Sequence, residues 1–292
     1  MSDEQRSPGS ASRLEAPPQS RFGLFNLSML LLIALVVANM WLIHQGLDRE
    51  QRNRLEHCFW QVCQPGATTE ARTQAMLQLV AAGNREWRSA NLARVKLSEL
   101  NLRNAYLHYA DLSSSDFSKT DLTGSILTKC DFQMANLTEI KASDADFTES
   151  NLYRTKLNNS DLRKAKFHAA RLQEAKLMSS DLMLAQLSEA NLLMADLTGA
   201  DLAGANLTEA NLTAATFKNA NLALARLSAA KIKDTDFTNC NWWRARGLAV
   251  QEIVRLKNKY APTTDADPKL REDFKTWLAS ITSSRGSNTN SP

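Results

Sequence analysis

The chain has 292 residues, of which 43% are apolar, so it can bury a sizeable core and is not a disordered protein overall. Its 35 basic and 31 acidic residues give a formal net charge of only +4, which does not by itself indicate a nucleic-acid-binding protein. All seven prolines lie outside residues 66–261. Because proline lacks a backbone donor, this distribution predicts a long hydrogen-bonded ladder within that segment.

The first part of the chain changes character at residue 24. Residues 1–23 are rich in Ser, Pro, Gln and charged side chains, which predicts a disordered tail. Residues 24–43 carry no charge and would form a helix about 30 Å long, the thickness of a hydrocarbon core. We predict a transmembrane helix here, and a single-pass protein of a bacterial inner membrane. The alternative is a cleavable signal peptide ending near Ala38, although the apolar run continues past that residue.

The orientation of this predicted span is not fixed by charge, because three arginines precede it and three follow it closely. Cys58 and Cys63 lie just beyond the span, and in an oxidising compartment they would close a small disulfide loop. On this ground we predict that the body of the protein is extracytoplasmic. The alternative is a pair of reduced cysteines on a juxtamembrane helix.

A five-residue repeat runs without interruption from Leu92 to Trp242. Its 31 central positions hold 22 Leu, six Phe, one Ile, one Trp and one exception, Ala142. Two residues earlier, 28 of the 31 positions hold Ala, Ser, Thr or Cys, and immediately before the centre 19 hold Asp or Asn. This period fits neither a helix nor a plain strand, but it fits a short extended piece followed by a turn. Four such units would form a square coil of 20 residues.

The motif A(D/N)LXX over residues 90–245 resembles the pentapeptide-repeat family. The resemblance implies an all-β solenoid, a right-handed quadrilateral β-helix of about eight coils. We expect the small residue and the Leu or Phe to point inward, and the Asp or Asn between them to point outward and bond nearby backbone. The glycines of the repeat should lie at corners, and Ile140 should fill the space that Ala142 leaves.

The open ends of such a coil would expose unpaired strand edges, so we expect helical caps. The predicted organisation is a juxtamembrane segment with N-terminal capping helices at 44–86, the β-helix at 87–245, C-terminal capping helices at 246–281 and a disordered tail at 282–292. A helix at 68–82 should cover the first coil near Trp87. Helices at 248–259 and 268–281 should close the last coil, the second through Phe274 and Trp277.

The sequence contains no loop insertion in the repeat and no motif typical of an active site, so we expect no enzyme, no cofactor and no metal site. The basic residues between Arg154 and Lys176 encircle the predicted coil rather than form a patch, so we expect no nucleic-acid partner. We predict a membrane-tethered scaffold, or platform for protein interactions, with an unknown and membrane-associated protein partner.

Two alternative functions are carried beside this one. Some pentapeptide-repeat proteins are inhibitors that mimic DNA and bind type II topoisomerases. Such a mimic requires an acidic surface, whereas residues 90–245 hold 18 basic and 18 acidic residues. The other alternative is an assembly factor that responds to redox state through Cys58 and Cys63.

One surface stands out as a candidate binding site. Outward positions along one face and its following corner are apolar or small, and they should form a flat strip. The large members are Met183, Leu184, Leu224 and Trp243, with Ala203, Gly204 and Ala223 between them. The alternative is that these are scattered surface residues, or that the C-terminal helices cover them.

Overall fold

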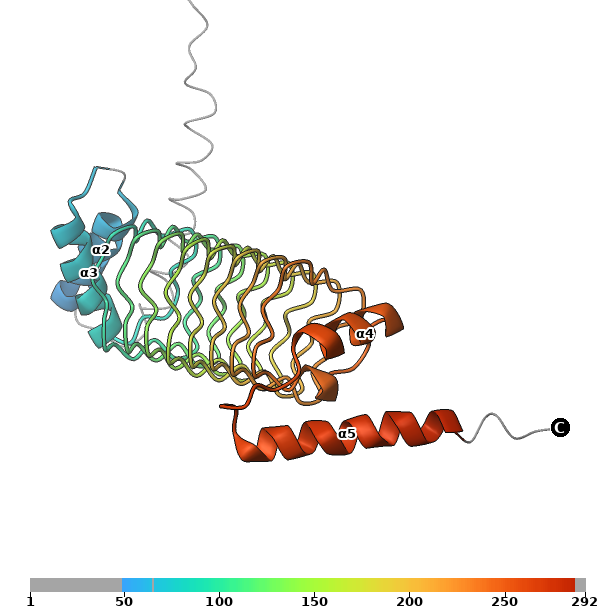
Figure 1. The fold of residues 1–292 in the computed structure, drawn as a ribbon. Helices are drawn as coiled ribbons and strands as arrows, with labels where there is room; N and C mark the ends of the chain where they lie inside the picture. The colour runs from blue at the N-terminus through green and yellow to red at the C-terminus, as the bar shows by residue number, and fades with distance from the viewer. Residues whose placement is uncertain (1–48, 65, 287–292) are drawn as a thin grey trace, which may run out of the picture. The chain divides into compact units, whose positions relative to one another are not determined.

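The computed structural model describes residues 49–64 and 66–286 (Figure 1). The elements follow in the order α2 (Arg49–Cys63), α3 (Thr69–Ala81), a long series of bridged coils, the 3-10 turn η1 (Trp242–Arg244), α4 (Val250–Lys259) and α5 (Pro268–Gly286). The predicted tail at 1–23 and the predicted span at 24–43 lie outside the described residues. No helix within the described ranges is both long and apolar enough to cross a membrane.

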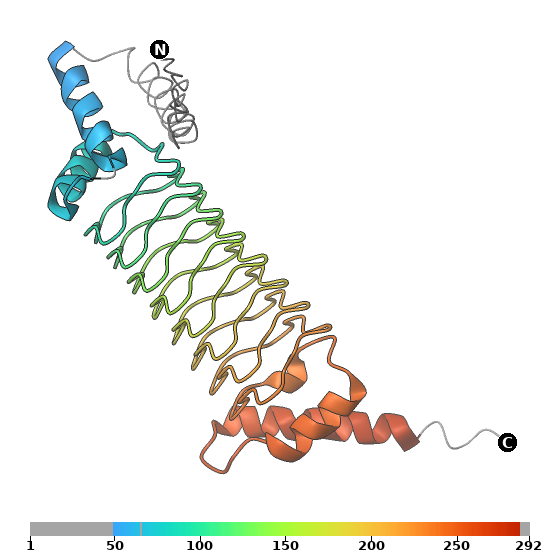
Figure 2. The same cartoon turned by 90° about the horizontal axis from the view of Figure 1, so that it is seen from above.

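The coils are built from parallel bridges between residues 20 apart. They run from Glu86↔Tyr106 to Arg226↔Arg246, which spans eight coils, and Figure 2 shows the coils following one another in chain order. Each bridge uses two backbone hydrogen bonds, as where Leu92 N donates to Asp111 O at 2.7 Å and Asp111 N donates to Ala90 O at 3.0 Å. The predicted 20-residue coil is confirmed, and it explains why the repeat excludes proline.

Every corner turns through a residue with a left-handed backbone. At the second residue after each centre, from Ser89 to Asn239, φ lies between 52° and 68°. The small residue closes each turn, as where Ala90 N donates to Trp87 O at 3.2 Å. This is the geometry of a type II turn, and Gly124, Gly199 and Gly204 occupy corners as predicted. Most corners hold other residue types, so the stacked ladder outweighs a conformational cost of about 1 kcal/mol at each.

The Asp and Asn side chains stabilise the corners and the stack. Their Oδ1 atoms accept from the backbone N–H two residues later, for example from Ser113 to Asp111 at 3.0 Å and from Ala203 to Asp201 at 2.9 Å. Between coils, an Asn amide donates to the residue stacked on it, as from Asn136 Nδ2 to Asp116 Oδ1 at 3.0 Å. The outward Asp and Asn residues therefore form turns and rungs, as the sequence predicts.

The core is a column of Leu and Phe side chains. Phe147 and Phe167, one coil apart, stack with ring centroids 4.9 Å apart and an interplanar angle of 7°. Inward hydroxyls are satisfied within the core. Most donate to the carbonyl of a centre in the preceding coil, as from Thr120 to Leu97 O at 2.7 Å, and Ser115 donates to Leu112 O of its own coil. Ile140 and Ala142 are both fully buried, as the proposed exchange of large and small residues requires.

Helix α3 contacts the first coil, whose outer backbone groups have no preceding coil to bond. Its N-cap, Thr68, accepts from Ala71 N at 3.2 Å. The buried Arg72 donates to the carbonyl of Asn91 at 3.2 Å and to the side-chain oxygen of that residue. Lys96 N donates to Thr73 Oγ1 at 3.4 Å. Side chains of α3 thus bond backbone groups at the edge of the first coil, near the fully buried Trp87.

Helix α4 and the segment after it contact the last coil in a similar way. Arg255 Nη2 donates to Ile232 O at 3.1 Å, and the Tyr260 hydroxyl donates to Thr235 O at 2.8 Å. The indole of Trp242 donates to Tyr260 O at 3.0 Å.

Helix α5 packs its aromatic residues against the same coil, with Phe274 and Trp277 in edge contact with Trp242. Helix α5 ends at Gly286, five residues beyond its predicted end. The helix ends at the first glycine after Pro268.

Candidate interaction surface

Three of the four large residues of the predicted strip are exposed. Met183 is 37% exposed, Leu184 48% and Leu224 56%, while Ala203 and Ala223 between them are partly exposed. All lie at the corner that follows one face of the coil, in three successive coils. We call Met183, Leu184, Ala203, Gly204, Ala223 and Leu224 the apolar strip.

The strip is continuous across the coils because Leu184 leans over Gly204. A Cβ atom built on Gly204 would lie only 2.8 Å from Leu184 Cδ2, so the leucine occupies the space above the glycine corner. The absence of a side chain at Gly204 therefore lets Leu184 fill the gap between one coil and the next.

Trp243 does not belong to the exposed strip, which corrects the prediction. It is only 6% exposed, its ring contacts Phe274 at 4.8 Å, and its indole Nε1 donates to Asp273 Oδ2 at 2.8 Å. The reason is that the last coil ends in η1 and α5 packs on that turn. This is the alternative in which a C-terminal helix covers part of the strip, and it applies to Trp243 alone among the four large residues.

Charged groups bound the apolar strip along its corner. On the side of lower residue numbers, Arg163 Nη2 lies 2.7 Å from Asp161 Oδ2, and Arg163 Nε lies 3.6 Å from Asp181 Oδ2. The hydrogen bond from Arg163 lowers the pKa of Asp161 and raises that of the arginine. On the other side lies the ion pair between Arg244 and Asp273. An apolar centre with a polar rim is the usual anatomy of a protein interface.

Three of the seven Lys and Arg residues between Arg154 and Lys176, the basic belt, form ion pairs with acidic residues. Besides Arg163, Arg154 Nε lies 2.7 Å from Glu174 Oε2, and Lys166 Nζ lies 3.6 Å from Asp146 Oδ2. The belt residues lie on different faces of the coil, since Lys156 bridges Lys176, Lys166 bridges Asp146 and Arg171 bridges Asn151. They do not form the continuous positive stripe that nucleic-acid binding uses.

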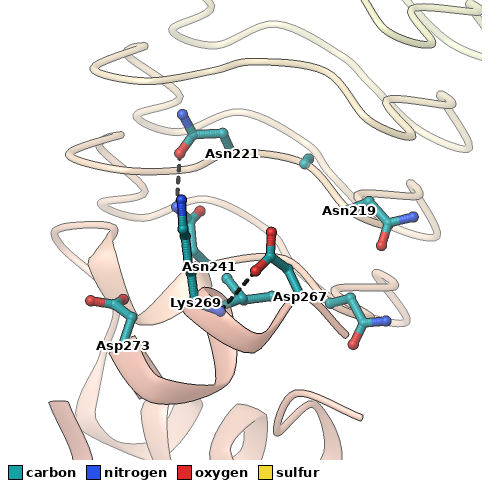
Figure 3. Close-up of a pocket in the computed structure, with 9 residues that line it drawn as sticks. Asn219, Asn221, Asn241, Asp267, Lys269 and Asp273 are labelled. Atoms are coloured by element: carbon teal, nitrogen blue, oxygen red, sulfur yellow. Dashed lines mark hydrogen bonds between the residues drawn. The ribbon is translucent and has the colours of Figure 1, made fainter. Parts of the chain in front are cut away.

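A polar pocket of about 430 Å³ lies between the last two coils and the start of α5 (Figure 3). Asparagine amides and residues of α5 line it, and the labelled ones are Asn219, Asn221, Asn241, Asp267, Lys269 and Asp273. Much of its polar surface is already bonded internally. Asn241 Nδ2 donates to Asn221 Oδ1 at 2.7 Å, Lys269 N donates to Asp267 Oδ1 at 2.7 Å, and Asp273 accepts from Trp243 and Arg244.

Among the described residues no group of three or more His, Cys, Asp or Glu could hold a metal ion. The charged side chains that line the pocket are Asp267, Lys269 and Asp273.

Three of the four cysteines, Cys58, Cys130 and Cys240, are buried thiols. Cys130 Sγ donates to Leu107 O at 2.9 Å, and burial raises its pKa to about 12 and also raises that of Cys240. Cys58 is a free thiol that donates to Gln78 Oε1 at 2.8 Å. It shares α2 with Cys63, and helix geometry separates Cα atoms five residues apart by about 8.6 Å, beyond the reach of a disulfide. The structure therefore does not support the predicted Cys58 to Cys63 disulfide.

The comparison with family models agrees with the coil geometry. The model of pentapeptide repeats matches eight copies, over residues 88–124, 107–141, 145–183, 165–204, 180–219 and 205–241. Together these ranges cover more than half of the chain, so the chain belongs to the pentapeptide-repeat family, and its coil is a right-handed quadrilateral β-helix. No curated protein matches the chain by sequence.

Several solved structures are similar to it. HetL, a pentapeptide repeat protein involved in heterocyst differentiation regulation in Nostoc sp. strain PCC 7120, is 27% identical over 57% of this chain and 95% of its own, with a TM-score of 0.28. Rfr23 of Cyanothece 51142 is 35% identical over 29% of this chain and 58% of its own, with a TM-score of 0.29. Full-length QnrB1, a plasmid-mediated fluoroquinolone resistance protein, is 18% identical over 60% of this chain and 96% of its own, with a TM-score of 0.32.

Proposed function

We propose that this chain is a non-enzymatic scaffold that binds a protein partner through the apolar strip and is tethered to a membrane by residues 24–43. The observation that carries the proposal is the exposure of Met183, Leu184 and Leu224 on one corner of three successive coils. Other large apolar side chains are exposed elsewhere on the described coils. This set differs from them because Leu184 and Gly204 join it into one surface with a charged rim.

A stiff surface is an advantage for such a scaffold. The corners are fixed by the interstrand ladder, as where Leu184 N donates to Ala203 O at 3.0 Å and Leu224 N donates to Arg244 O at 3.0 Å. A partner would therefore lose little free energy to the ordering of loops on binding. We expect the partner to present an apolar, membrane-associated surface that matches a strip two coil spacings long, or roughly 10 Å.

We further propose that α3, α4 and α5 cap the coil. The contacts that support this are the bonds from Arg72 to Asn91 O and from Arg255 to Ile232 O, because they engage carbonyls at the two ends of the ladder. Caps of this kind would prevent edge-to-edge polymerisation and leave the sides of the coil available for binding.

The binding proposal is tested by site-specific photo-crosslinking in native membranes. A photoreactive amino acid at Leu224 should crosslink to one defined partner, and the same group at the exposed Met134, on another corner, should not. The double variant Met183→Glu with Leu184→Glu should abolish the crosslink and retain the fold, since neither side chain points inward. An unchanged crosslink in the double variant would contradict the proposal.

The tether is tested separately. Removal of residues 1–43 should release the protein from sedimented membranes, and a phosphatase reporter fused after Ile281 should be active if the body is extracytoplasmic. A full-length chain that remains in the soluble fraction would contradict the tether, and an inactive reporter would contradict the orientation.

A further inference from the structure

A second group of exposed side chains lies in the first three coils, away from the apolar strip along the sequence. It consists of Tyr106, His108 and Tyr109, with Arg88, Ile126 and Lys129 beside them, and we call it the aromatic cluster. Tyr109 is 53% exposed and Ile126 41% exposed. Tyr106 and Ile126 are joined by a parallel bridge, so they lie side by side on one face of adjacent coils.

The rings of the cluster hold one another in place. His108 contacts Tyr109 edge-on with ring centroids 4.1 Å apart, and it lies 6.1 Å from the ring of Tyr106. The other side of the imidazole is fixed by a hydrogen bond between His108 Nδ1 and Thr128 Oγ1 in the next coil. Pre-positioned aromatic side chains lose little entropy on binding, which makes them effective anchors in protein interfaces.

Two cations flank the rings. The guanidinium of Arg88 lies 5.4 Å from the centroid of Tyr106 and donates to its hydroxyl at 2.9 Å. The ammonium of Lys129 lies 5.6 Å from the centroid of Tyr109 and 3.5 Å from Glu149 Oε2. Among the described residues Arg88 makes no ion pair, so most of its donors are available. Burial lowers the pKa of His108 most, and the charges of Arg88 and Lys129 lower it further.

From this arrangement we infer that the aromatic cluster is a docking surface for an acidic segment of another protein that also carries an aromatic side chain. A carboxylate would bind Arg88, which offers a planar donor fork, and an aromatic ring would pack on Tyr109 and Ile126. The surface lies in coils before those of the apolar strip. The inference therefore does not depend on the proposed partner of the strip.

The inference is tested on the full chain with three labelled polymers: a random copolymer of glutamate and tyrosine, polyglutamate, and a copolymer of lysine and tyrosine. Fluorescence anisotropy should show the tightest binding for the glutamate and tyrosine copolymer and none for the cationic one. Arg88→Ala and Tyr109→Ala should each weaken that binding about tenfold or more. Thermal unfolding should confirm that both variants remain folded.

Matched controls separate a built surface from general charge attraction. Arg94 lies at another corner of the same coil as Arg88, and Lys119 lies at a corner like that of Lys129, with φ of 60° and 57° for the two lysines. Arg94→Ala and Lys119→Ala should change the affinity less than twofold. Equal losses in the controls, or equal affinity for polyglutamate, would overturn the inference.

A membrane surface is the other target for tyrosines and cations, and it is tested in the same series. Vesicles with anionic lipid should bind the chain lacking residues 1–43 equally well with and without Arg88→Ala. If that substitution abolishes vesicle binding and the acidic copolymer does not bind, the cluster faces lipid and the inference is wrong. Variants of the apolar strip should leave copolymer binding unchanged, so failure of either proposal is recognised independently.

Discussion

Asp273 of α5 accepts the indole hydrogen bond of Trp243 at 2.8 Å, and the same carboxylate pairs with Arg244. A single side chain therefore joins the last helix to the end of the coil. Arg244 lowers the pKa of Asp273 below its ordinary value of 3.8. A carboxyl with a lowered folded-state pKa stabilises the fold above its unfolded pKa, and that contribution is lost as the pH falls through the folded value.

We expect Asp273→Ala to loosen α5 and to cost about 1–2 kcal/mol, since the ion pair is partly exposed but the indole is buried. Hydrogen exchange of residues 268–281 should rise at pH 7, and in the unsubstituted protein it should rise below about pH 4. The control is Glu272→Ala, which removes only an exposed pair with Lys275 at 3.6 Å. Equal exchange in the two variants would show that Asp273 does not hold the helix.

The pair of Ile140 and Ala142 makes a prediction about packing. Both are fully buried on the same side of one strand, so Ala142→Leu alone should overpack the core and cost about 1–3 kcal/mol. Adding Ile140→Ala should restore part of the loss. Equal free energies of unfolding for the single and double variants, measured by denaturant titration, would refute the exchange of volumes.

Thiol labelling should separate the caps from the coil. Cys58 of α2 donates to Gln78 of α3, and burial raises its pKa, so alkylation at pH 8 should require only local opening of the helix pair. Cys130 and Cys240 should react only on global unfolding, because both lie in the core with raised pKa values. Mass spectrometry of labelled peptides would resolve the three sites. Labelling of all three at one rate would contradict independent opening of the cap.

Two glycine corners isolate the contribution of Leu184. Gly199 and Gly204 have the same φ of 68°, but a Cβ atom would lie 3.5 Å from Ser179 Oγ at the first and 2.8 Å from Leu184 Cδ2 at the second. Both alanine variants should lose about 1 kcal/mol from the left-handed backbone. Gly204→Ala should lose more, and Leu184→Ala should remove that excess in a double-mutant cycle. Binding at the apolar strip should weaken only in Gly204→Ala.

The periodic part of the structure was predictable because one signal, repeated 31 times, fixes the coil length, the inward residues and the corners. The contacts of α5 were not, since its apolar face predicts only that it packs somewhere on the end of the coil. For that reason the sequence predicts Trp243 to lie in the exposed strip, whereas it is buried. The sequence likewise does not distinguish a helix at Cys58 and Cys63 from a loop closed by a disulfide between them, because it does not show whether the last turn of α2 is helical.

The aromatic cluster was missed for a different reason. Tyr106, His108 and Tyr109 are conspicuous in the sequence, but Arg88 and Lys129 become their neighbours only when the chain is wound at 20 residues per coil. Winding the sequence at that period would have revealed the contact between Arg88 and Tyr106, because residues 18 to 22 apart meet at one corner or face. The exact ring contacts depend on side-chain rotamers and need the structure.

Because the bridges join residues 20 apart, the residue number of a surface feature gives the side of the coil on which it lies. One pentapeptide is a quarter of a coil, so the loss or duplication of a single unit between residues 130 and 180 would rotate the apolar strip about 90° relative to the aromatic cluster and leave the core intact. The directions in which the two bound partners face would then change relative to one another. A repeat of this kind can therefore change how it orients an assembly through small changes in length, without altering the residues that make either contact.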